Sequence, residues 1–129
     1  MITEDSSLLK KMIIDSLSIA GYSNVIALSN GKEAWDKLLE LKNDNSLPLF
    51  DKICCVITDI EMPKMDGHRL TKLIRDDSEL KALPVIIFSS LIDEEMRLKG
   101  TLLGASAQVS KPEIGKLVGI VDSLTSQAQ

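Results

Sequence analysis

Five polar residues with complementary chemistry stand at or near the ends of short apolar segments of this 129-residue chain. They are Glu4, Asp5, Asp59, Ser89 and Lys111. If the apolar segments are parallel strands, these residues meet in space, because the carboxyl ends of neighbouring strands lie at one edge of a sheet. The sequence therefore predicts a site with three carboxylates, one hydroxyl and one ammonium group.

The chemistry of this set points to a metal ion and a phosphoryl group. Three crowded carboxylates repel one another, and a hard divalent cation such as Mg²⁺ relieves that repulsion. A carboxylate can attack phosphorus to give an acyl phosphate, and the cation and Lys111 could neutralise the transferred oxygens. Taken singly, Asp59, Ser89 and Lys111 are equally well explained as a turn residue, a helix N-cap and a solvated lysine. Only their joint position favours a site.

Apolar segments alternate along the chain with segments of helical period, which is typical of a parallel sheet covered by helices. The expected strands are residues 1–3, 24–28, 53–58, 85–88 and 107–109. The expected helices are residues 8–20, 34–41, 70–74, 93–103 and 114–124, with a turn at 30–31 and a polar loop at 43–49. One domain over residues 1–129 is expected, an α/β doubly wound (βα)₅ flavodoxin-like sandwich with a parallel five-stranded sheet of order 2-1-3-4-5.

Bulk properties exclude several other classes of protein. The net charge of −4 and pI near 5.0 argue against direct binding to nucleic acid, which needs a basic surface. No apolar run approaches the ~20 residues of a membrane span. Cys54 and Cys55 are neighbours that would point to opposite faces of a strand, so no disulfide is expected. These features fit a cytoplasmic protein.

The segment from Asp59 to Gly67 reads Asp-Ile-Glu-Met-Pro-Lys-Met-Asp-Gly and resembles the phosphoacceptor segment of response-regulator receiver domains. Glu4-Asp5 matches the acidic pair of that family, Ser89 its hydroxyl residue and Lys111-Pro112 its Lys-Pro. The resemblance covers essentially the whole chain. Within the family, residues 88–92, 94–96, 104–108 and 111–118 are most similar to the receiver half of the chemotaxis adaptor CheV.

The resemblance implies a role for each site residue. Asp59 would accept the phosphoryl group, while Lys111 and Ser89 would contact its oxygens. The ligands of Mg²⁺ would be Glu4, Asp5, Asp59 and Glu61, with Glu4 acting through water and Glu61 through its backbone carbonyl. The peptide bond between Lys111 and Pro112 would be cis.

The resemblance also implies partners. The phosphodonor would be a histidine kinase, CheA in the case of CheV, at a chemoreceptor array, and a CheW-like coupling domain would precede residue 1. Gln108 stands where many receivers carry an aromatic residue that rotates on activation, so that rotation is not expected here.

Two other functions remain open at this point. Asp59-Ile60-Glu61 loosely resembles the paired acidic residues of haloacid-dehalogenase phosphatases. The chain is, however, too short for that fold with its cap domain. A receiver fold that has lost phosphorylation and serves only as an interaction module is the second alternative. Retention of the acidic pair, the acceptor, the hydroxyl and the lysine speaks against it.

Other polar or large residues are expected to be structural. His68 is expected at a solvated surface position, and Arg69, Lys72 and Arg75 on a solvated helix face. Trp35 is expected to pack at or near the core.

Overall fold

The computed structural model describes residues 1–90 and 92–127. Within them, the strands form one parallel sheet of order β2-β1-β3-β4-β5. The strands are β1 (Ile2–Thr3), β2 (Ala27–Leu28), β3 (Val56–Thr58), β4 (Val85–Ser89) and β5 (Ala107–Ser110). This order confirms the doubly wound α/β fold predicted from the sequence. No helix in the described part of the chain is long and apolar enough to cross a membrane.

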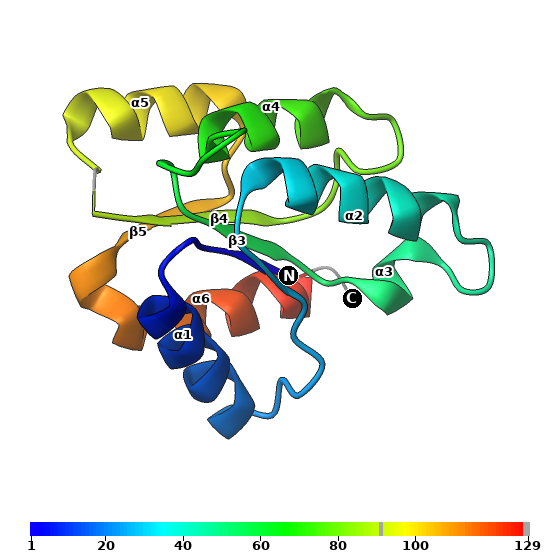
Figure 1. Ribbon diagram of the computed structural model, residues 1–129, viewed down its shortest axis with the longest axis horizontal. Coiled ribbons are helices and arrows are strands. Elements are labelled where there is room, and N and C mark those ends of the chain that lie inside the picture. The colour runs from blue at the N-terminus through cyan, green and yellow to red at the C-terminus, as the bar shows by residue number, and fades with distance from the viewer. Residues whose placement is uncertain (91, 128–129) are drawn as a thin grey trace.

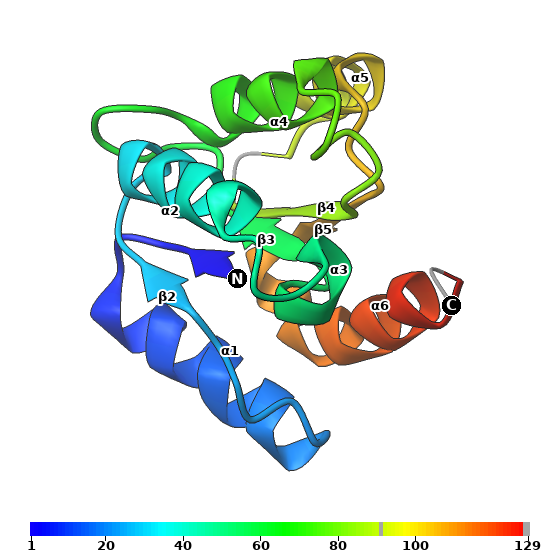
Figure 2. The same ribbon diagram turned by 90° about the vertical axis from the view of Figure 1, so that its right-hand side faces the viewer.

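Helices cover both faces of the sheet (Figures 1 and 2). On one face lie α1 (Ser7–Ile19) and α6 (Ile114–Gln127); on the other lie α2 (Gly31–Asn43), α4 (Gly67–Asp76) and α5 (Glu94–Leu103). A 3₁₀ turn, η1 (Lys111–Glu113), precedes α6, and a four-residue helix, α3 (Leu49–Lys52), follows Pro48. The sequence analysis did not predict α3, because a single turn contains too few residues to show a helical period.

The core has two parts, one on each side of the sheet, because successive side chains of a strand point to opposite faces. Val56 and Val85 pack with α2 and α4, whereas Ile57 and Ile86 pack with α1 and α6. Trp35 packs against the first of these parts, as expected. The consecutive apolar residues of β3 and β4 are therefore explained by burial on both faces.

Three helices on the α2–α4–α5 face begin at a polar N-cap. The side chains of Asn30, Asp66 and Asp93 accept hydrogen bonds from the backbone N–H three residues later, at 2.9, 2.7 and 2.8 Å. Each bond satisfies a donor that a helix leaves free at its start. Asn30 and Gly31, expected as a turn, are instead the N-cap and first residue of α2. At the other end of α5, Gly104 adopts φ +97, where a glycine is favoured.

Two expectations for α4 were wrong. His68 is buried, with 3% of its surface exposed, because α5 packs beside α4. Arg75 is partly buried and donates hydrogen bonds to the carbonyl oxygens of Gly104 (2.8 Å) and Leu83 (2.6 Å). Arg75 therefore joins α4 to the chain before β4 and after α5.

The cis geometry implied for the Lys111–Pro112 peptide bond stays a prediction, because the side chain of Pro112 lies outside the described part of the structure.

Candidate functional site

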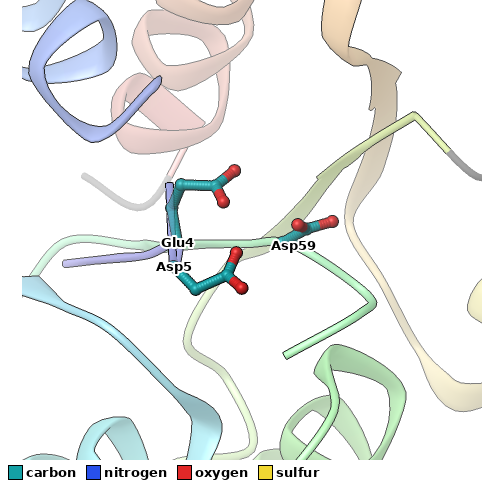
Figure 3. Close-up of side chains that lie close together, drawn as sticks. All are labelled: Glu4, Asp5 and Asp59. Carbon is teal, nitrogen blue, oxygen red and sulfur yellow. The ribbon is translucent and has the colours of Figure 1, made fainter. Parts of the chain in front are cut away.

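Glu4, Asp5 and Asp59 lie together at the carboxyl edge of the sheet (Figure 3). One ligand oxygen from each lies within 4.8 Å of the other two. Glu4 and Asp5 follow β1, and Asp59 follows β3, which is the neighbouring strand in the sheet. The winding of the chain changes direction between these two strands, which is where doubly wound sheets bind ligands.

Asp59 is nearly buried and is held by hydrogen bonds at both carboxylate oxygens. Oδ1 accepts from the backbone N–H of Ile60 at 2.7 Å, and Oδ2 accepts from Lys111 Nζ at 2.9 Å. Only 6% of the residue is exposed. Its carboxylate is therefore fixed in position at the point where the strand ends.

Lys111 bridges two of the carboxylates. Besides its bond to Asp59, its Nζ lies 2.8 Å from Glu4 Oε1. Burial acts to lower the pKa of Lys111, but its bonds to Asp59 and Glu4 outweigh burial and raise that pKa above the ordinary value of 10.5. Lys111 is therefore a permanent positive charge between two negative ones.

Glu4 is buried, with 2% of its surface exposed, and is only partly satisfied. Oε2 accepts a hydrogen bond from the backbone N–H of Ser6 at 3.1 Å. Oε1 pairs with Lys111 by charge, yet within the described residues no donor is directed at it with hydrogen-bond geometry. Burial raises the pKa of Glu4 above 4.5, although Lys111 and the Ser6 amide act in the opposite direction. A buried oxygen of this kind suits a further ligand.

This donor set fits a hard divalent cation. Glu4, Asp5 and Asp59 supply oxygen atoms only, and Asp5 is exposed to solvent, so that water could complete the coordination. Lys111 supplies one positive charge beside three carboxylates. A cation bound here would offset the remaining negative charge.

A pocket of about 490 Å³ opens beside Asp59. It is lined by Asp5, Asp59, Glu61, Met62, Pro63, Asp66, Ser90 and Lys111. The sequence analysis did not assign Met62, Pro63, Asp66 or Ser90 to the site, although the first three belong to the segment that carried the resemblance. Ser89, which was predicted as the hydroxyl residue, is fully buried as the last residue of β4, and Ser90 is the serine that lines the pocket.

Gly67, the first residue of α4, lies in close contact with the backbone of Asp59. A Cβ at this position would lie 1.9 Å from the backbone oxygen of Asp59, and the Gly67 N–H donates to Ile60 O at 2.8 Å. The start of α4 can approach Asp59 this closely only because residue 67 has no side chain. Gly31 plays the same part at the start of α2, where a Cβ would lie 2.2 Å from Met65 O.

The fold and this acidic edge define a class of signalling protein. Residues 1–122 match the response regulator receiver domain family, and the chain belongs to that family.

Individual relatives agree with this assignment. Chemotaxis protein CheY1 of Helicobacter pylori is 30% identical over 112 residues, which are 87% of this chain and 83% of that protein. A protein-glutamate methylesterase/protein-glutamine glutaminase of Archaeoglobus fulgidus is 37% identical over 132 residues, which are 100% of this chain but only 32% of that protein. The signal receiver domain of a signal transduction histidine kinase from Syntrophus aciditrophicus has a similar structure, with a TM-score of 0.82 at 26% identity over 99% of this chain and 89% of that one.

Proposed function

We propose that Asp59 accepts a phosphoryl group from a histidine kinase in two-component signalling, with Mg²⁺ bound at the acidic edge. The arrangement of Asp59 supports this most directly, because its carboxylate lies beside those of Glu4 and Asp5 and is paired with Lys111. An Asp placed only for a turn or a cap would need neither neighbour.

In the proposed transfer, a carboxylate oxygen of Asp59 attacks the phosphorus of a phosphohistidine. The new P–O bond forms as the P–N bond breaks, and the leaving histidine nitrogen takes up a proton. Lys111 stabilises the transferred oxygens by its charge, and the Ser89 hydroxyl contacts one of them in the product. Asp5, Asp59 and the Glu61 carbonyl would hold Mg²⁺, with Glu4 acting through water. Bound Mg²⁺ supplies further positive charge at the transferred oxygens.

The signalling context we propose is chemotaxis in the cytoplasm. Similarity to the H. pylori chemotaxis protein supports this context, and the segments at 88–92 and 104–108 support a CheV-like receiver that acts with the kinase CheA at a receptor array. The domain would regulate rather than turn over a substrate, since the methylesterase relative is matched over only about a third of its length. No specific observation favours either alternative, a phosphatase or an interaction module that has lost phosphorylation.

Phosphorylation of the purified chain with acetyl phosphate tests the proposal. With Mg²⁺, the intact mass should rise by one phosphoryl group, and with EDTA it should not. Asp59→Asn should abolish the adduct. The matched control is Asp36→Asn, which removes an exposed carboxylate on α2 that pairs with Lys32 at 2.7 Å. An undiminished adduct in Asp59→Asn would place the acceptor elsewhere.

A further inference from the structure

Helices α4 and α5 run side by side (Figures 1 and 2). A second hollow, distinct from the Asp59 pocket, lies between them. This α4–α5 groove has a volume of about 270 Å³. It is lined by Asp66, His68, Arg69, Lys72, Lys99 and Leu103. Three of these side chains are cationic and one is anionic, although the chain as a whole carries a net charge of −4.

One of the three cations, Lys72, forms only a weak exposed pair with another residue. Lys72 pairs with Asp76 at 2.9 Å, but both side chains are more than half exposed. Exposed ion pairs contribute little to the stability of a protein. The one anion, Asp66, already accepts a hydrogen bond from the backbone N–H of Arg69. Positive charge therefore remains in the groove for a negatively charged ligand.

His68 gives an independent reason to expect a ligand. The residue is 3% exposed, and its Nε2 atom is buried without a hydrogen-bond partner among the described residues. Buried polar atoms are nearly always paired, and leaving one unpaired is unfavourable. Burial, and then the charge of Lys99, lower the pKa of His68 below 6.5, so the ring is neutral at pH 7. A neutral imidazole protonated at Nε2 can donate one hydrogen bond.

We propose that the α4–α5 groove binds a small phosphate-bearing anion. One phosphate oxygen accepts a hydrogen bond from His68 Nε2, and the other oxygens are contacted by the guanidinium of Arg69 and the ammonium groups of Lys72 and Lys99. A planar guanidinium with several donors and two ammonium groups are the donors that recognise tetrahedral oxyanions. The site differs from the phosphoryl pocket, with which it shares only Asp66 as a lining residue.

A titration of the ¹⁵N-labelled chain with sodium pyrophosphate, followed by NMR, tests this. Ionic strength is held constant with NaCl, and EDTA removes divalent cations so that the acidic pocket repels the probe. The expected result is saturable shifts of the amides of residues 66–72 and 99–103, together with a shift of the His68 Nε2 signal. Inorganic phosphate, tested in parallel, should give the same pattern at lower affinity, since it offers fewer oxygens.

Substitutions of single lysines distinguish a specific binding site from nonspecific electrostatic attraction. Lys99→Gln should weaken binding by about tenfold or more, as expected for the loss of one charge-assisted hydrogen bond. Lys72→Gln should also weaken it. The matched control is Lys32→Gln, because Lys32 is an equally exposed lysine in an equivalent i,i+4 pair, with Asp36. Lys32→Gln should leave the dissociation constant unchanged.

Three results would overturn the proposal. The first is a set of shifts that grow linearly and spread over the whole surface. The second is equal weakening by Lys32→Gln and Lys72→Gln, which would mean net charge alone attracts the probe. The third is saturable shifts confined to residues 59–63 and 111, which would place the anion in the phosphoryl pocket.

Discussion

Lys111 is the residue on which the charge balance of the site depends. Its Nζ lies 2.8 Å from Glu4 and 2.9 Å from Asp59, and both carboxylates are almost fully buried. Removing one partner of a buried ion pair leaves the other charge uncompensated, and this is far more costly than losing an exposed pair. The same residue would serve the folded state before phosphorylation and the phosphoryl oxygens after it.

Lys111→Gln should therefore lower the free energy of unfolding by about 3 kcal/mol in the absence of metal. Mg²⁺ should recover part of this loss, because the cation takes over the neutralisation of Glu4, Asp5 and Asp59. Urea unfolding with Mg²⁺ and with EDTA measures both effects. Lys32→Gln, at an exposed pair, should change stability by no more than about 0.5 kcal/mol in either buffer. Equal effects of the two variants would show that Lys111 does not balance buried charge.

Single residues also show where sequence reasoning succeeded. The proximity of Glu4, Asp5, Asp59 and Lys111 could be predicted because strand order alone brings the ends of β1, β3 and β5 to one edge. The burial of His68 could not be predicted in this way. It depends on how α5 packs against α4, and no periodicity within α4 reports the position of another helix.

At the level of elements, Gln108 joins β5 to α5. Its Nε2 donates hydrogen bonds to Arg97 O at 2.8 Å and to Thr101 Oγ1 at 3.1 Å. A Cβ on Gly100 would lie 2.4 Å from Gln108 Oε1, so the amide occupies the space that this glycine leaves. The residue that replaces the usual aromatic is thus a fixed contact between strand and helix.

This contact predicts coupling between positions 100 and 108. Gly100→Ala alone should change stability by less than about 0.5 kcal/mol, because moving the Gln108 amide from its two hydrogen bonds offsets the gain of about 1 kcal/mol from a better helix former. In a Gln108→Ala background, the same substitution should instead stabilise by about 0.5–1 kcal/mol. Thermal or urea unfolding of the four variants completes the cycle.

Gly119→Ala on α6 is the matched control for this cycle. A Cβ at Gly119 meets no atom within 4 Å, so this substitution should stabilise the domain to the same extent in both backgrounds. If Gly100→Ala behaved like Gly119→Ala in the otherwise unchanged chain, the close packing of Gln108 against α5 would be refuted.

Elements differ in how far the sequence predicts them. Residues 85–88 are consecutively apolar, and they form the first four residues of β4, a strand buried on both faces. Edge strand β2 has only two residues where five were expected, and both pair with β1, which itself has only two residues. Arg75 was assigned to a solvated face by its spacing from Arg69 and Lys72, but its long side chain reaches backbone carbonyls on two other segments.

At the scale of the whole molecule, Asp77 ties α2 to the segment between α4 and β4. Its Oδ2 accepts a hydrogen bond from Lys42 Nζ at 2.7 Å, and its Oδ1 accepts from the backbone N–H groups of Glu79 and Leu80 at 2.9 and 3.1 Å. The hydrogen bond to Lys42, and then those to the backbone, hold the pKa of Asp77 below its ordinary value of 3.8. This carboxylate therefore joins parts of the chain that are 35 residues apart.

Asp77→Asn should lower the free energy of unfolding by about 1–3 kcal/mol at pH 7, because the bond to Lys42 is lost and the turn is weakened. The pH dependence follows from the lowered pKa. Near pH 3.8 the unfolded chain binds a proton at Asp77 more readily than the folded chain, so the contribution of this carboxylate is fully present well above that pH and is lost as the pH falls below it, through the lower pKa of the folded state. The difference between wild type and Asp77→Asn should shrink accordingly when urea unfolding is measured at pH 7, 5 and 3.

Asp76→Asn is the neighbouring control for this prediction. Asp76 pairs with Lys72 on the exposed side of α4, where both side chains are more than half exposed, and such a pair is expected to contribute less than about 1 kcal/mol. If Asp77→Asn were no more destabilising than Asp76→Asn at pH 7, or if its effect were unchanged at pH 3, the carboxylate of Asp77 would not be the group that fastens α2 to the loop before β4.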